Sequence, residues 1–273
     1  FNNWYYENKL ESVPCHSYSM GIPYLSILES GEMDIFDFFV CRNKADTKLL
    51  KKRYGDKHAM YLPDFVFIEQ VSKINKFAIL SNSKNTNPII SIFLAKPCIN
   101  DVILNKLGNF INKHSDKYNF IAYPLNTNQN NINENDYSQS VELHRRAPTL
   151  NIISDKLDFD KIIYLLKKSY FSICVRLHAH IFSIIAETPF ISIYSTRKVR
   201  NLLDDFELNH LGTALILECS YCNQKIQPPN TGQSEYLETL EKGCMSCRQM
   251  CGKPVDLNES ELDTLHENII KNH

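Results

Sequence analysis

FSICVRLHAHIFSIIAETPFISIY, residues 171–194, contains the clearest architectural pattern of the chain. The apolar run from Phe171 to Val175 predicts a buried strand, which ends at Arg176-Leu177-His178. Residues 179–186 have the apolar content and length of a helix, a Thr-Pro pair breaks them, and residues 190–194 predict a second strand. The segment therefore predicts a strand, a tight turn, a helix and another strand, as in a parallel α/β sheet.

The turn carries a basic residue and an imidazole at a helix start. Unpaired backbone N–H groups and the positive end of the helix dipole lie there, so Arg176 and His178 predict a site for a phosphate or a carboxylate. Arg197 and Lys198 follow the next strand, and the ends of adjacent parallel strands lie side by side. Both basic groups should meet at one crevice, whereas His180 faces elsewhere on the helix and is interpreted as structural.

Composition limits the classes of function. The 273 residues are 43% apolar, which supports one large or two modest domains. Thirty basic and 31 acidic residues give a formal charge of −1, so there is no overall electrostatic footprint for nucleic acid or an anionic membrane. The opening residues are too polar for a signal peptide and no run has the length of a membrane span. We expect a cytoplasmic protein of undetermined oligomeric state.

Nine cysteines divide into two groups. Cys15, Cys41, Cys98 and Cys174 are scattered and are interpreted as free thiols. Two CxxC pairs 21 residues apart have nearly the spacing of a structural zinc site, with a further cysteine as a possible alternate ligand. The predicted zinc ligands are Cys219, Cys222, Cys244 and Cys247, with Cys251 as the alternate. An iron–sulfur cluster and a redox CxxC pair remain the rival interpretations.

Outside that module, strands and helices alternate. Residues 36–41 and 58–62 predict strands on either side of a helix over 44–54, and residues 70–87 are polar enough for a boundary. From residue 88 the alternation continues to 217 and predicts a doubly wound parallel sheet.

Five blocks together resemble the polysaccharide pyruvyl transferase family. Individually they are short, and the last, with its Arg-x-His, Pro, Tyr and Lys pattern, is the most specific. The blocks are SYSMGIPYL (17–25), FDFFVCRNKADTKLLKKRYG (36–55), YLPDFVF (61–67), IISIFLAKP (89–97) and RLHAHIFSIIAETPFISIYSTRKV (176–199).

The resemblance implies a GT-B-like α/β fold of two Rossmann-like domains facing a cleft. The glycine-rich first strand of the family has no match, so the N-terminal domain is expected to be incomplete. The implied divisions are a partial N-terminal Rossmann-like domain over 1–80, a C-terminal one over 88–217, a zinc-binding Cys-rich insertion over 218–254 and a C-terminal helix within 255–273.

The implied chemistry is transfer of a pyruvyl group from phosphoenolpyruvate to the hydroxyls of a glycan acceptor, forming a ketal. By position, Arg176 and His178 match the Arg-x-His pair, Lys198 the basic residue after the following strand, and Lys96 a frequent arginine. Arg197 is a further candidate for binding this doubly anionic donor. His178 is the candidate acid/base, since histidine titrates near neutrality, and its neighbours favour the neutral form.

Other interpretations remain open. Arg176 could instead pair with Asp204 or Asp205, and Asp64 could cap a turn. The chain could be a GT-B glycosyltransferase using a nucleotide sugar, although no acidic residue is placed for a ribose. It could also be a non-catalytic scaffold, and whether this chain alone is active stays open.

Overall fold

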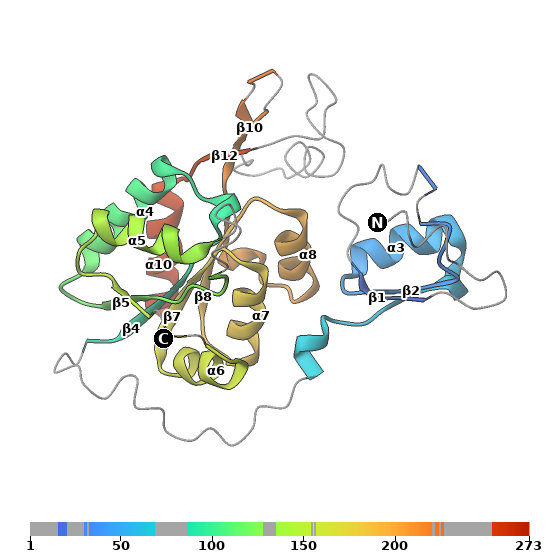
Figure 1. The fold of residues 1–273 in the computed structure, drawn as a ribbon, viewed down its shortest axis with the longest axis horizontal. Coiled ribbons are helices and arrows are strands. Elements are labelled where there is room, and N and C mark those ends of the chain that lie inside the picture. Colours follow the sequence, from blue (N-terminus) through green and yellow to red (C-terminus); the bar gives the residue numbers. More distant parts are fainter. Residues whose placement is uncertain are drawn as a thin grey trace.

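The computed structural model of the chain describes residues 16–20, 30–31, 33–68, 87–127, 135–153, 155, 157–219, 222–223, 225–226 and 253–272. Within these residues the strands form a six-stranded parallel sheet, a three-stranded parallel sheet and a small three-stranded antiparallel sheet (Figure 1). The α/β class with a parallel sheet is therefore confirmed.

The large sheet has the order β6-β5-β4-β7-β8-β9, and every neighbouring pair is parallel. From β4 the chain builds outward through β5 and β6, and then returns to the other side of β4 with β7. This reversal makes β4 and β7 neighbours at the topological switch point, where doubly wound sheets bind ligands. The strands are β4 (Ile89–Phe93), β5 (Asn119–Ala122), β6 (Asn151–Ile152), β7 (Ser169–Cys174), β8 (Phe190–Tyr194) and β9 (Gly212–Ala214).

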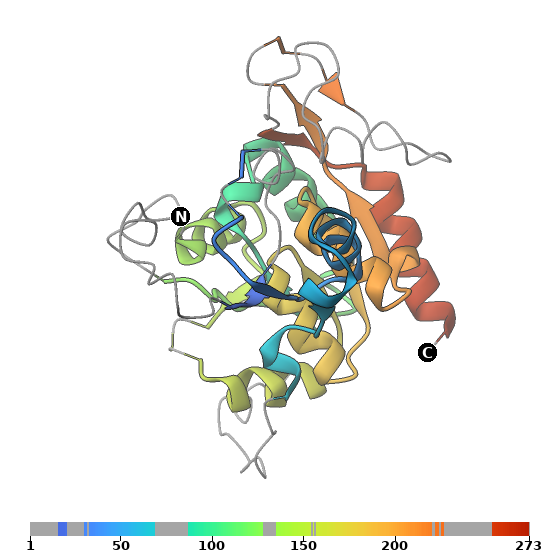
Figure 2. The ribbon, with the colours of Figure 1, turned by 90° about the vertical axis from the view of Figure 1, so that its right-hand side faces the viewer.

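Helices cover both faces of this sheet (Figures 1 and 2). Because side chains alternate along a strand, Ile90 and Ile92 enter the core under α4, α5 and α10, whereas Phe93 enters the core under α6, α7 and α8. Burial on both faces explains the nearly continuous apolar runs of the sequence. The helices are α4 (Asp101–His114), α5 (Asp136–Arg146), α6 (Phe159–Lys167), α7 (Leu177–Ile185), α8 (Arg197–Asp205) and α10 (Glu259–Asn272).

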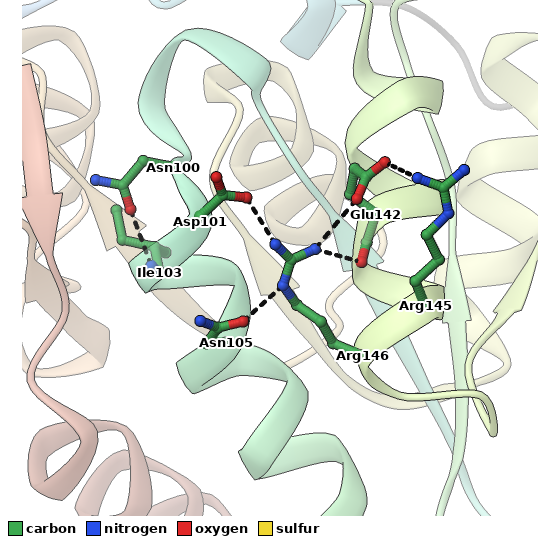
Figure 3. Close-up of polar contacts among 7 residues, drawn as sticks. All are labelled: Asn100, Asp101, Ile103, Asn105, Glu142, Arg145 and Arg146. Atoms are coloured by element: carbon green, nitrogen blue, oxygen red, sulfur yellow. Dashed lines mark hydrogen bonds and ion pairs between the residues drawn. The ribbon is translucent and has the colours of Figure 1, made fainter.

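A guanidinium fixes α5 against α4. Arg146 donates from Nε to Asn105 Oδ1 (2.7 Å) and from Nη2 to Asp101 Oδ1 (2.6 Å), and it also returns to the Glu142 carbonyl of its own helix (Figure 3). Gly108 permits this approach, because a Cβ there would lie 3.0 Å from the Arg146 Cβ. The contact holds the C-terminal end of α5 against the first turns of α4.

The small parallel sheet has the order β1-β2-β3, with β1 (His16–Met20), β2 (Phe38–Cys41) and β3 (Ala59–Tyr61). Helix α3 (Lys44–Tyr54) lies on it and buries Leu50 against Phe39. The Asn43 side chain caps α3 by accepting from the Asp46 N–H, and the chain leaves the helix at Gly55, whose φ is 98°.

Most predicted elements occur close to their predicted bounds. Helix α3 has the predicted bounds, and α8 begins at Arg197 because Thr196 adopts the extended N-cap conformation. The short strands β9, β10 (Ile216–Glu218), β11 (Lys225–Ile226) and β12 (Lys253–Asp256) were not predicted. Each of these has two to four residues and is held by pairing with another strand, which for β9 and β12 is distant in the sequence.

The predicted domain limits stay a prediction. The polar segment at 70–86 lies outside the described residues, as do Cys15, Cys244, Cys247 and Cys251. Among the helices that are described, none combines the length and the apolar content needed to cross a bilayer.

Candidate functional site

The candidate site lies where β4 and β7 end. Phe93 pairs with Cys174 at the last register position, so the chain leaves the two strands side by side and reaches Lys96 and Arg176 within three residues. Lys96 and Arg176 therefore both follow strands that meet at the switch point of the sheet.

Asp136 organises this edge. Its carboxylate is fully buried, and it accepts a two-point contact from Arg176, through Nε to Oδ2 and through Nη2 to Oδ1 (2.7 Å). It also accepts the backbone N–H groups of Lys96 and Asn126, each at 3.1 Å. One carboxylate therefore ties the ends of β4 and β7 to the start of α5 and fixes the plane of the Arg176 guanidinium.

The contact between Arg176 and Asp136 decides which carboxylate pairs with Arg176, a point that the sequence left open. Arg176 pairs with Asp136 rather than with Asp204 or Asp205, and a quarter of its side chain stays exposed. Its carbonyl begins α7 by accepting from the Ala179 N–H (3.0 Å). A fixed cation therefore stands at a helix N-terminus, where an anion is favoured.

His178 lies in the first turn of α7 with its ring exposed and stacked against Phe182, at 6.1 Å between ring centroids. Desolvation by surrounding protein atoms lowers its pKa, and the charges of Arg42 and Arg176 lower it further, whereas the Asp64 carboxylate opposes them. The lowered pKa favours the uncharged ring, which can accept a proton.

The charges of Arg42 and Asp64, which follow strands of the small sheet, act on His178. Arg42 directly follows β2, and its Nη1 lies 3.5 Å from Asp64 Oδ2. Asp64 also accepts the Val66 N–H (3.3 Å), so the predicted turn role is present together with the ion pair. The short helix Phe65–Ile68 that follows packs on α7, which holds this ion pair near the imidazole.

The two basic residues at the start of α8 differ in environment. Arg197 is buried, and its Nη2 lies 2.7 Å from Oδ1 of the buried Asp46 on α3. Lys198 is an exposed residue. Desolvation by the protein atoms around it and the charge of Arg42 lower its pKa, whereas the charge of Asp46 raises it. Lys198 therefore lies with the Arg42 group, whereas Arg197 joins α8 to α3.

Lys96 lies on the Asp136 side of the site. Its Nζ donates to Ser138 Oγ of α5 at 3.2 Å. Burial raises the pKa of Cys98, two residues further on. A hydrogen bond with Ser195, which follows β8, and the charge of Arg176 lower this pKa, and the charge of Asp136 raises it. The ends of β4, β7 and β8 therefore contribute to one polar cluster.

His180 is a core residue, as expected. It is buried, and its Nδ1–H donates to the Arg176 carbonyl while Nε2 accepts from Ser192 Oγ, both at 2.7 Å. Burial lowers its pKa to about 4, so it stays neutral and ties α7 to β8. The same contact fixes the backbone at Arg176.

The first CxxC pair lies at the tip of a hairpin. Strands β10 and β11 are antiparallel, and Cys219 and Cys222 lie in the connection between them. The Asn223 N–H donates to the Cys219 carbonyl at 2.8 Å, and Asn223 has a φ of 57°. This turn suits one half of a four-cysteine site. Among the described residues no group of three potential metal ligands occurs.

Sequence reasoning missed Asp136, Arg42 and Ser195. Asp136 carries one local signal, since Asn135 caps α5 by accepting the Ser138 N–H at 3.2 Å. An Asn-Asp pair is common where a helix begins, and nothing in it indicates that the aspartate contacts a residue 40 positions away.

The fold and site define an α/β protein of GT-B-like architecture. It is similar to the solved structure of a putative UDP-N-acetylglucosamine 2-epimerase from Listeria monocytogenes, with a TM-score of 0.55 and 11% identity over 98% of this chain and 61% of that one. It is also similar to an S. aureus MnaA–UDP co-structure, with a TM-score of 0.51 and 14% identity over 76% of this chain and 63% of that one. The chain thus spans less than two thirds of the length of either.

A family model assigns the chain more narrowly. The polysaccharide pyruvyl transferase model matches residues 34–197, which include Arg42, Asp64, Asp136 and the Arg176–His178 turn, and the chain belongs to that family. No curated protein matches the sequence.

Proposed function

We propose that this protein transfers the pyruvyl group of phosphoenolpyruvate to hydroxyls of a glycan, giving a carboxylate-bearing ketal and inorganic phosphate. The observation that carries the proposal is the Arg176 guanidinium, held by the buried Asp136 at the start of α7 inside the family match. Phosphoenolpyruvate carries a phosphate and a carboxylate, and a fixed guanidinium beside a helix N-terminus suits such an anion.

The remaining cations extend this donor site. In the proposal Arg176 and the N–H groups at the start of α7 bind one anionic group of the donor, and Lys96 and Lys198 neutralise the other. Arg42 adds charge from the small sheet. Arg197 contributes indirectly, by holding α8 against α3 through Asp46.

His178 is the proposed general base. One sugar hydroxyl adds across the C2=C3 double bond of the donor: its oxygen bonds to C2, its proton passes to the base, and one proton is delivered to C3, which becomes the methyl group, so that the base is restored overall. A second hydroxyl then replaces the phosphate at C2, and its proton leaves with the phosphate or through the base. The lowered pKa of His178 keeps its imidazole ready to accept a hydroxyl proton at neutral pH.

Thermal-shift titration tests the donor. Phosphoenolpyruvate should raise the melting temperature of the wild-type chain, and Arg176→Lys should weaken binding about tenfold, because lysine keeps the charge but loses the two-point contact. Lys167→Gln removes a cation of α6 and serves as the control. A donor response that is equal in all three proteins would contradict the assignment.

A nucleotide-sugar donor is the second candidate, because the MnaA structure above is a complex with UDP. The same titration with UDP-N-acetylglucosamine separates the two. A shift with the nucleotide sugar and none with phosphoenolpyruvate would favour the glycosyltransferase. No response to either would favour a non-catalytic scaffold.

We also propose a structural zinc ion bound by Cys219, Cys222, Cys244 and Cys247. The turn at Asn223 fits the first pair, which supports the prediction from the CxxC spacing. When bound, zinc would supply folding free energy to the segment that joins the two cysteine pairs.

Elemental analysis tests the metal. One zinc per chain is expected in the purified protein, and Cys219→Ser or Cys244→Ser should each abolish it. The control is Cys174→Ala, which removes a buried thiol of β7 that contacts Ser183 of α7, and this variant should retain the metal. Iron in place of zinc, or full metal content in the two serine variants, would reject the site.

A further inference from the structure

A lysine-lined groove lies along α3 on the small parallel sheet. It has a volume of about 430 Å³, and four lysines and one aspartate line it together with Thr47 and Tyr61; the charged residues are Lys44, Lys48, Lys51, Lys52 and Asp56. We call these seven residues the lysine groove. It is separate from the Asp136 cluster, and neither the donor binding nor the base proposed above uses it.

The positive charge of this groove is only partly explained by the fold. Lys44 Nζ donates to the Asp205 carbonyl at the end of α8 (3.0 Å), so that charge stabilises a helix C-terminus. In the part of the chain that the structure describes, the ammonium groups of Lys48, Lys51 and Lys52 form no ion pair.

The spacing of the lysines is unfavourable for the helix alone. Lys44, Lys48 and Lys52 follow one another at four-residue intervals, and like charges at that spacing repel on a helix surface. The helix dipole favours Lys51 and Lys52 in the last turn but does not account for Lys48. In a chain of net charge −1, this local excess indicates an anionic ligand.

Tyr61 narrows the class of ligand. Its ring is partly exposed in the groove, and Lys44 Nζ lies 5.8 Å from the ring centroid. An aromatic face beside several cations suits a ligand with an apolar ring face and negative substituents. A pyranose that carries a carboxylate has both, whereas inorganic phosphate has no apolar face.

We propose that the lysine groove binds carboxylate-bearing units of the glycan acceptor. This rests on the proposed function, because the ketal formed there retains the pyruvyl carboxylate, and each reacted unit therefore adds a negative charge to the polymer. The groove begins at Lys44, two residues before Asp46, and Asp46 contacts Arg197 beside Lys198. A chain held there would keep its already modified units bound beside the donor site.

Binding of a fluorescein-labelled polygalacturonate oligomer to the full chain, measured by anisotropy, tests the groove. The variant Lys48→Gln/Lys51→Gln/Lys52→Gln should bind at least about tenfold more weakly, since at least one charge-assisted contact is lost. The control Lys117→Gln/Lys167→Gln/Lys168→Gln removes the same charge from other surfaces and should bind as the wild type does. Wild-type affinity should also fall as salt rises.

Three results would overturn the proposal. These are equal affinity for neutral dextran oligomers, equal losses in the two triple variants, and tighter binding to vesicles of anionic phospholipid than to the polyuronate. Phosphoenolpyruvate titration of the groove variant separates this inference from the proposed function. If the groove variant keeps its thermal shift with phosphoenolpyruvate but no longer binds the polyuronate, the groove is supported. If a folded variant loses both responses, the proposal is contradicted.

A wild-type chain that binds polyuronate through the groove but never responds to phosphoenolpyruvate would reject the donor and leave the groove as an acidic-glycan site. The circular dichroism spectrum and melting temperature of each variant check folding.

Tyr61→Phe keeps the ring, and it should bind the polyuronate as the wild type does, whereas Tyr61→Ala should bind more weakly. Equal binding by these two variants would contradict the role of the ring.

Discussion

Arg197 Nη2 and Asp46 Oδ1 lie 2.7 Å apart, with both side chains at least nine-tenths buried. The pair connects α8 of the large sheet to α3 of the small one. Around it, Asn201 Nδ2 donates to Asn43 Oδ1 (3.1 Å), and the rings of Phe67 and Phe206 stack at 5.0 Å. A buried ion pair therefore joins the two parallel sheets next to the candidate site.

Truncating one partner of this pair should be costly. Arg197→Ala leaves the Asp46 carboxylate buried without its counter-charge, so we expect a loss of about 3–5 kcal/mol in the free energy of unfolding. Urea unfolding followed by circular dichroism measures this change. The neighbouring exposed Lys198→Ala should change the free energy by less than about 0.5 kcal/mol. Equal effects of the two changes would show that the buried pair has no special role.

Asp136 is expected to act on the donor through Arg176. Asp136→Asn removes the carboxylate that orients the guanidinium, so phosphoenolpyruvate should bind about tenfold more weakly although Asp136 itself makes no contact with the donor. Isothermal titration measures the affinity. Because both residues act as one unit, the double variant Asp136→Asn/Arg176→Lys should lose little more than either single variant.

Additive losses in that double-mutant cycle would mean that Asp136 and Arg176 act independently. Ser140→Ala is the matched control, because Ser140 is buried on the same helix and its Oγ donates to the Asp136 carbonyl rather than to the carboxylate. It should leave donor affinity unchanged.

The pKa of His178 should respond to both charges of the small sheet, in opposite directions. Arg42→Gln removes a positive charge that lowers the pKa, so it should raise the pKa and move the acid limb of activity to higher pH. Asp64→Asn removes the opposing charge and should move the limb to lower pH. Histidine proton resonances followed by NMR give the pKa without needing activity. Shifts in the same direction in the two variants would contradict the arrangement.

The sequence was sufficient where local patterns set the structure. Helix α3 has its predicted bounds, and the alternation of apolar runs with helical segments predicted the parallel sheet. The Arg176–His178 turn was predicted at the end of a buried strand, where it lies. In these cases the capping group or the apolar period belongs to the element itself.

What the sequence could not provide depends on contacts between distant segments. Asp136 contacts Arg176 across 40 residues, and Arg197 contacts Asp46 across the two sheets. Strand β9 has three residues and is set by pairing with β8. The positions of charged residues in a sequence do not show which cation contacts which carboxylate. The position of Arg197 after a strand therefore predicted a donor ligand, whereas its main contact in the structure is Asp46.

His180 makes stability depend on pH below neutrality. Its pKa is about 4 in the folded chain because burial disfavours the charged ring, whereas an unfolded chain returns it to about 6.5. Between these values the unfolded chain binds more protons, so the free energy of unfolding should fall as pH falls from 6.5 to 4, by about 3 kcal/mol for this residue.

Urea unfolding at pH 7, 6, 5 and 4 measures that loss. In His180→Gln the amide can replace the contacts to the Arg176 carbonyl and Ser192 without titrating, so the pH dependence should be shallower by about 3 kcal/mol over this range. His266, whose pKa is also about 4, remains titratable in that variant and leaves a residual slope in the same direction. A pH profile of stability identical to that of the wild type would mean that His180 does not remain neutral in the core.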